Sequence, residues 1–108
     1  MKPFRLTRQA EEHLTEIAIW TLDTFGPRQA DAYEEDLILC CEQIANGSAP
    51  HQSCAILVDS IKEDLRFTRA GQHFVVFLET DDEVIIVDFL HSRCNLPAKL
   101  AHLESRSS

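Results

Sequence analysis

Apolar side chains in the first half of the chain recur at helical spacing. From Ala10 to Phe25 they lie three or four positions apart, with charged side chains on the other faces. Thr7 suits an N-cap, because its hydroxyl can accept a hydrogen bond from a first-turn N–H. Gly26 and Pro27 then predict the end of this helix and the start of a second, which runs to about Ala45. Such a short connection predicts an antiparallel helical hairpin.

From Leu65 the apolar spacing changes from helical to alternating. This alternation predicts three strands, LRFTR, HFVVFLE and VIIVDFLH, separated by the turn sequences AGQ and TDDE. The run VIIV is apolar on both faces, so the last strand should lie inside the sheet, covered by the helices on one side and partly screened on the other.

Three further segments complete the expected order of elements. Residues 3–6 are a short candidate strand, residues 47–60 look like an irregular connection, and Asn95 with Pro97 predicts a short C-terminal helix. The order β, α, α, β, β, β, α indicates an α+β fold. In it, an N-terminal strand and an antiparallel helical hairpin pack on an antiparallel β-sheet, followed by the short helix.

Length and composition fit one soluble domain. The 108 residues should form a single domain, 1–108, and 44% hydrophobic with 26% charged residues is ordinary for a globular protein. No apolar run approaches the roughly 18 residues of a membrane span, and the start of the chain lacks the apolar core of a signal peptide. We therefore expect a cytoplasmic protein with no membrane partner.

The four cysteines do not indicate a metal site. Cys40, Cys41, Cys54 and Cys94 show no CxxC spacing, and two of them are adjacent on an expected helix. We interpret them as reduced, small hydrophobic residues, and we expect neither a metal nor a cofactor.

The formal net charge of −8 argues against a dedicated nucleic-acid binder, because such surfaces carry an excess of Lys and Arg. Two short segments are locally basic. One contains Arg66 and Arg69, and the other contains Arg93 and Lys99. A basic patch would form if the strands placed these segments side by side.

Several strings in this order resemble the ParE family within the ParE/RelE toxin superfamily of bacterial toxin–antitoxin pairs. The matching strings are LTRQAEEHLTEIAIWTLDTFG, QADAYEEDL and DLRFTRAGQHFVVFLETDDEVIIVDFLHSRCNLP. The resemblance implies a toxin held in a hetero-oligomer by a ParD-like antitoxin, of ribbon-helix-helix type, whose tail wraps the toxin. ParE members resemble inhibitors of DNA gyrase, whereas RelE members cut messenger RNA in the ribosome. The shared fold cannot choose between these mechanisms.

The residues needed for RNA cleavage are incompletely represented. His91 and Arg93, with Arg66 and Lys99, offer an acid, a base and cations. RelE-like nucleases also use a tyrosine near the chain end, but here Tyr33 is the only tyrosine and lies on the inner face of the second helix. We therefore expect no catalytic residues and no direct nucleic-acid contact. A RelE-like nuclease and a non-toxic, antitoxin-binding relative are the alternatives.

The candidate contacts to an antitoxin or target lie at strand positions, on a helix flank and on the last helix: Trp20, Arg66, His91, Arg93, Leu96 and Leu100. The aromatic ring and the cations suit binding anchors, and the leucines suit an apolar groove for an antitoxin helix.

Each candidate also has a structural interpretation. Trp20 would pack under the long connection, and Arg66 would pair with Asp88 or Glu79 across the sheet. His91 would bond to nearby backbone at its strand end. Leu96 and Leu100, with Leu103, would belong to the core.

Overall fold

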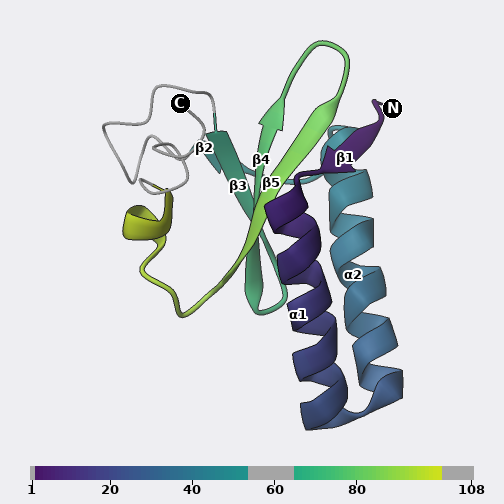
Figure 1. Cartoon of the computed structure of the whole chain (residues 1–108). Helices are drawn as coiled ribbons and strands as arrows, with labels where there is room; N and C mark the ends of the chain where they lie inside the picture. The colour runs from purple at the N-terminus through teal and green to yellow at the C-terminus, as the bar shows by residue number, and fades with distance from the viewer. Residues whose placement is uncertain (1, 54–64, 101–108) are drawn as a thin grey trace.

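The computed structural model describes residues 2–53 and 65–100. Two helices lie side by side on one side of a β-sheet (Figure 1). In chain order the elements are β1 (Phe4–Leu6), α1 (Arg8–Phe25), α2 (Pro27–Ala45), β2 (Gln52–Ser53), β3 (Leu65–Ala70), β4 (His73–Glu79) and β5 (Val84–His91). This arrangement confirms the α+β fold class, the helical hairpin and the three main strands that the sequence predicts.

The helix boundaries follow the predicted local chemistry. The Thr7 hydroxyl accepts from the N–H of Ala10 at 3.1 Å and so caps α1. Gly26 has a φ of +95°, which allows the chain to end α1 and start α2 at Pro27 without a longer loop. No helix among the described residues is long and apolar enough to cross a bilayer.

The sheet is mixed. In the described part of the chain the strand order is β1-β5-β4-β3-β2, with β1 parallel to β5 and the other pairs antiparallel. The sequence prediction of an antiparallel sheet therefore holds for β2 to β5. Strands β1 and β5 are the first and last strands of the described chain, and the helical hairpin and the other three strands lie between them in sequence. The short strand β2 falls in a segment where we expected an irregular connection, and residues 54–60 of that connection lie outside the described residues.

Strand β5 contains one extra residue relative to β4. Val76 pairs with Asp88 and Phe77 pairs with Ile86, so Val87 has no partner on β4. Such a bulge bends a strand and redirects its side chains. Here it occurs beside the only acidic residue of the strand, Asp88.

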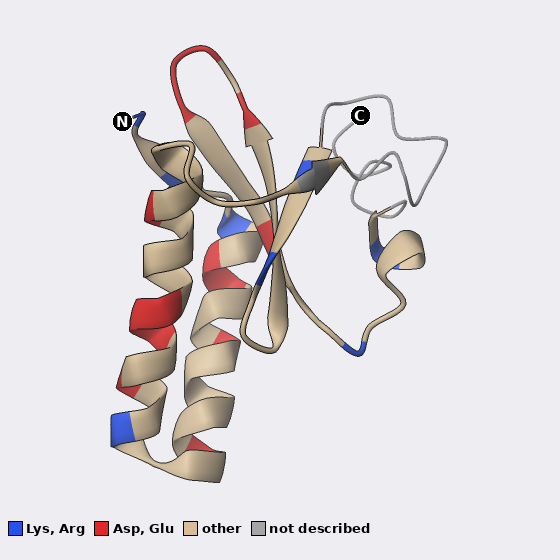
Figure 2. Ribbon diagram, turned by 180° about the vertical axis from the view of Figure 1, so that it is seen from behind, with Lys and Arg blue, Asp and Glu red and all other residues tan. Residues whose placement is uncertain are grey.

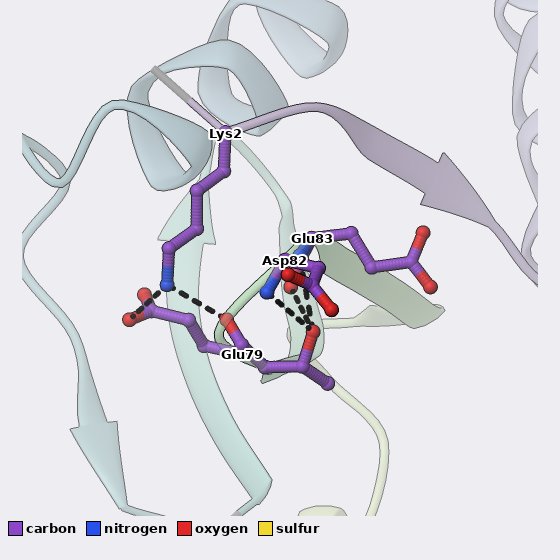
Figure 3. A network of polar contacts seen from close by, with 5 residues as sticks. Lys2, Glu79, Asp82 and Glu83 are labelled. Carbon is purple, nitrogen blue, oxygen red and sulfur yellow. Dashed lines mark hydrogen bonds and ion pairs between the residues drawn. The ribbon is translucent and has the colours of Figure 1, made fainter.

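The β4–β5 turn is bonded to the N-terminus. The Thr80 hydroxyl accepts from the backbone N–H groups of Asp82 and Glu83, at 3.3 and 3.0 Å (Figure 3). Lys2 Nζ donates to the carbonyl of Thr80 at 2.7 Å and to the carboxylate of Glu79 at 3.2 Å. These contacts hold β1 beside the turn and thereby support its pairing with β5.

The two faces of the sheet carry separate apolar clusters. The cluster under the helical hairpin includes Leu37, Cys41, Phe77 and Ile86, each at most 2% exposed. Burying a large apolar side chain contributes ~1.5–3 kcal/mol, so this cluster holds the hairpin to the sheet. The cluster on the other face is built from Leu65, Val76, Leu90, Leu96 and Leu100. The prediction that VIIV is covered by the helices on one face and partly screened on the other is therefore confirmed.

A helical turn at 96–100 follows β5 (Figure 1), and its Leu96 and Leu100 belong to the second cluster. Asn95 Oδ1 accepts from the N–H of Ala98 at 3.3 Å, which confirms the predicted cap. The rest of the predicted helix, including Leu103, lies outside the described residues.

Candidate functional site

The turn between β3 and β4 is attached to α2 by Tyr33. The Tyr33 hydroxyl lies 2.6 Å from Nδ1 of His73 and accepts from the backbone N–H of Gln72 at 3.0 Å. Its ring packs on Gly71, where φ is +60° and an added Cβ would lie 2.7 Å from Cε1 of the ring. The helix and the turn therefore fit together only with glycine at this position.

Replacing Gly71 by alanine should lower the free energy of unfolding by about 2 kcal/mol, through backbone strain and displacement of the Tyr33 ring. Gly47 is the matched control, because its φ is +81° but an added Cβ would meet nothing within 4 Å. Gly47→Ala should cost only about 1 kcal/mol. Urea denaturation of both variants measures the difference, and equal losses would contradict a close Tyr33 contact.

His73 is held as a neutral ring. It is 7% exposed, and burial together with the neighbouring His91 lowers its pKa from 6.5 to about 4. The Tyr33 hydroxyl has one hydrogen, and Nδ1 of His73 at 2.6 Å is a much closer acceptor than the Ala70 carbonyl at 3.4 Å, so we assign the phenol hydrogen to Nδ1 of His73 and the ring hydrogen to Nε2. Burial also raises the pKa of Tyr33, so the phenol keeps its proton.

His91 lies beside His73, with ring centroids 5.2 Å apart. Its Nδ1 accepts from the backbone N–H of Arg93 at 3.0 Å, so the neutral ring carries its hydrogen on Nε2. This bond confirms the interpretation of His91 as a strand-end residue bonded to nearby backbone. It also shapes the turn that positions Arg93.

Asp88 joins the bulged part of β5 to the first turns of α1. Its carboxylate is 1% exposed and accepts from Gln9 Nε2 at 2.6 Å and from the N–H of Phe89 at 2.8 Å. Nδ1 of His13 lies 2.5 Å from Oδ1 of the same carboxylate. A buried carboxylate with several partners fixes the position of the helix on the strand.

A groove runs between α1 and the end of β5. It consists of two adjoining clefts, of about 500 and 450 Å³, that share Trp20, His73 and His91. We call it the Trp20 groove. The larger cleft continues along His13, Cys94 and Lys99, and the smaller one along Phe25, Tyr33 and Arg93.

Aromatic side chains form the exposed wall of the Trp20 groove. Trp20 is 58% and Phe25 61% exposed, and the two rings meet edge to face at 5.8 Å. Ile19 and Leu22 on the same helix are also about half exposed. Large exposed apolar residues gathered on one helix are typical of an interaction surface.

Comparisons with known proteins identify the family. The profile of the ParE toxin of the type II toxin–antitoxin system parDE matches residues 4–96. The chain belongs to the ParE toxin family. It is 31% identical over 100 residues to Toxin ParE1 of Caulobacter vibrioides, covering 93% of this chain and 99% of that protein. A chain of the chromosomal ParDE TA system from P. aeruginosa has the same fold, with a TM-score of 0.66, 19% identity, and coverage of 84% of this chain and 96% of that chain.

Three of the predicted contact residues of this ParE-family toxin come together. Trp20, His91 and Arg93 all line the Trp20 groove, although they come from α1, the last residue of β5 and the following turn. Trp20 is exposed and packs against Phe25, which supports the interpretation as an anchor. The alternative prediction, that Trp20 packs under the long connection, concerns residues 54–64, which lie outside the described residues.

The other predicted contact residues of the toxin lie elsewhere. Arg66 is on β3, opposite Phe77, and β4 separates β3 from β5. The basic segments around Arg66 and Arg93 therefore do not lie on neighbouring strands. Asp88 and Glu79 are the carboxylates expected to pair with Arg66. Asp88 contacts Gln9 and His13, and Glu79 contacts Lys2.

Leu96 and Leu100 of the toxin are 9% and 0% exposed, in the second apolar cluster. This position agrees with their interpretation as core residues. The charged side chains expected away from the apolar stripe of α1 include exposed acidic residues, and acidic residues recur along both helices (Figure 2).

Sequence reasoning missed two polar pairs in the toxin. Asp88 interrupts an apolar strand, and a lone carboxylate in such a run signals a buried, bonded group. The sequence contains no comparable signal for the hydrogen bond between Tyr33 and His73, which lie 40 residues apart.

No group of three or more metal-ligating side chains converges within residues 2–53 and 65–100 of the toxin. Cys40, Cys41 and Cys94 are free thiols, and Cys54 lies outside the described residues. Burial raises the pKa of Cys94, so the thiol in the groove stays protonated at neutral pH and is a poor nucleophile.

Proposed function

We propose that this toxin inhibits DNA gyrase by binding it as a protein, and that a ParD-like antitoxin with a ribbon-helix-helix domain neutralises it in a hetero-oligomer. The observation that carries the proposal is the Trp20 groove, which offers exposed aromatic rings and few cations. Such a surface suits a protein partner, because a few aromatic and Arg side chains carry most of the binding energy in protein–protein interfaces. Membership of the ParE family supports the same mechanism.

The polar groups of the groove are poorly arranged for RNA cleavage. A nuclease needs a base, an acid and several cations around one phosphate. Nδ1 of His73 and the hydroxyl of Tyr33 bond to each other, and Arg93 is the only Lys or Arg side chain that lines their cleft. This arrangement favours a structural role for the pair and a mechanism without covalent chemistry.

Supercoiling by purified gyrase, measured with added toxin, tests the proposal. We expect loss of supercoiling and accumulation of cleaved DNA. Programmed ribosomes incubated with the same preparation should retain intact messenger RNA. Codon-specific cleavage that disappears in the Arg93→Ala, His91→Ala double variant would instead identify a RelE-like nuclease. Activity in neither assay, with full binding to the antitoxin, would identify a non-toxic relative.

A further inference from the structure

The hydrogen bonds around the two histidines direct donor groups into the Trp20 groove. His91 accepts at Nδ1 from Arg93 N, and His73 accepts at Nδ1 from the Tyr33 hydroxyl, so both neutral rings carry their hydrogen on Nε2. No buried polar side-chain atom of the described residues lacks a hydrogen-bond partner. Nε2 of His73 makes no hydrogen bond within the described residues, so it is not a fully buried atom. It is therefore open to the groove that His73 lines. His73 and His91 thus present N–H donors to the groove.

The local charge of the groove is opposite to that of the whole chain. The net charge of the protein is −8, yet Arg93 and Lys99 line the groove, and Glu16 is the only carboxylate among its lining residues. Asp88 lies nearby, but its oxygens are occupied by Gln9, His13 and the N–H of Phe89. An anionic group therefore meets favourable electrostatics here and is repelled by most of the remaining surface.

The size and walls of the groove restrict which anion fits. Two cations are too few for a nucleic-acid backbone, which demands several phosphate contacts. A single carboxylate needs only one cation and one or two N–H donors. Trp20 and Phe25 supply an apolar wall directly beside those donors, so the complete site also needs a large apolar group next to the anion.

We infer that the Trp20 groove binds a segment of a protein partner that presents an Asp or Glu carboxylate beside a bulky apolar side chain. The carboxylate lies against Arg93 and the Nε2–H groups of His73 and His91, and the apolar side chain packs on Trp20 and Phe25. This inference deepens the proposed function, since it defines the chemistry of the partner that this toxin recognises.

Trp20 is the only tryptophan, so its fluorescence reports directly on the groove. The probes are three capped peptides, acetyl-Phe-Glu-Leu-amide, acetyl-Phe-Gln-Leu-amide and acetyl-Gly-Glu-Gly-amide. We expect the first to change Trp20 emission at millimolar concentration. The second should bind about tenfold more weakly, because it loses the charge-assisted hydrogen bonds. The third should not bind measurably, because it lacks the apolar side chains.

Two arginine variants with the same loss of charge complete the test. Arg93→Ala should weaken binding of the glutamate peptide about tenfold. Arg69→Ala should leave it unchanged, because Arg69 of β3 lies over the ring of Phe74 of β4 and does not line the groove. Equal affinity of the glutamate and glutamine peptides, or equal effects of the two variants, would overturn the inference. So would an absence of any Trp20 response, or tighter binding of a single-stranded oligonucleotide than of the peptide.

The titration uses neither antitoxin nor gyrase. A titration without peptide binding would therefore overturn the inference about the groove but not the proposed inhibition of gyrase. A gyrase assay without inhibition would not change the peptide binding that we expect.

Discussion

Asp88→Ala is expected to lower the free energy of unfolding by about 3 kcal/mol, because it removes the shared acceptor of a buried network. The Asp88 carboxylate is 1% exposed and bonds to Gln9, His13 and the N–H of Phe89. The alanine variant leaves the Phe89 N–H without its side-chain acceptor and frees the start of α1 from β5. Equilibrium urea denaturation at pH 7 measures the loss.

Glu83→Ala is the matched control for Asp88→Ala. The Glu83 carboxylate pairs with Arg5 Nε at 3.0 Å, but both side chains are at least one third exposed. Exposed ion pairs contribute under about 1 kcal/mol, so this variant should change stability only slightly. Similar losses in the two variants would show that Asp88 does not fix α1 on the strand.

Acid should destabilise this toxin through His73. Its pKa is lowered from 6.5 to about 4 in the folded protein, so between these values the unfolded chain binds a proton that the folded chain does not. Stability is therefore complete above pH 6.5 and falls as the pH approaches 4. At 1.36 kcal/mol per pH unit, the contribution of this residue to the loss is at most about 3 kcal/mol.

His73→Gln isolates this effect from the titration of other groups. The glutamine carbonyl can still accept from the Tyr33 hydroxyl, but the side chain does not titrate. The free energy of unfolding, measured between pH 4 and 7.5, should fall less steeply with acid in the variant than in the wild type. Parallel curves for the two proteins would contradict a buried, neutral His73.

The main elements could be predicted because their signals are local. The helical spacing up to residue 25, the Gly26–Pro27 connection and the three alternating strands each determine their own segment. The parallel pairing of β1 with β5 could not be predicted in the same way. It joins residues about 80 positions apart in the chain, and the three residues of β1 contain no signal of direction.

The site was predicted only in part. Trp20 is recognisable because it lies off the apolar stripe of α1, and His91 and Arg93 because they end an apolar strand. Their meeting depends on the packing of α1 against β5, which joins residues distant in sequence, such as Gln9 and His13 with Asp88. Leu96 and Leu100 show the same spacing whether they are buried or bind a partner, so only the fold places them in a core cluster.

Gyrase supercoiling tests most directly the central claim that this ParE-family toxin acts by binding protein through the Trp20 groove. With folded toxin at micromolar concentration, we expect supercoiling to stop, cleaved DNA to accumulate, and a saturating amount of cognate antitoxin to restore activity. Arg93→Ala should require several-fold more toxin for the same inhibition, and Arg69→Ala should match the wild type. Undiminished supercoiling, with folded wild-type toxin at the same concentration, would contradict the account.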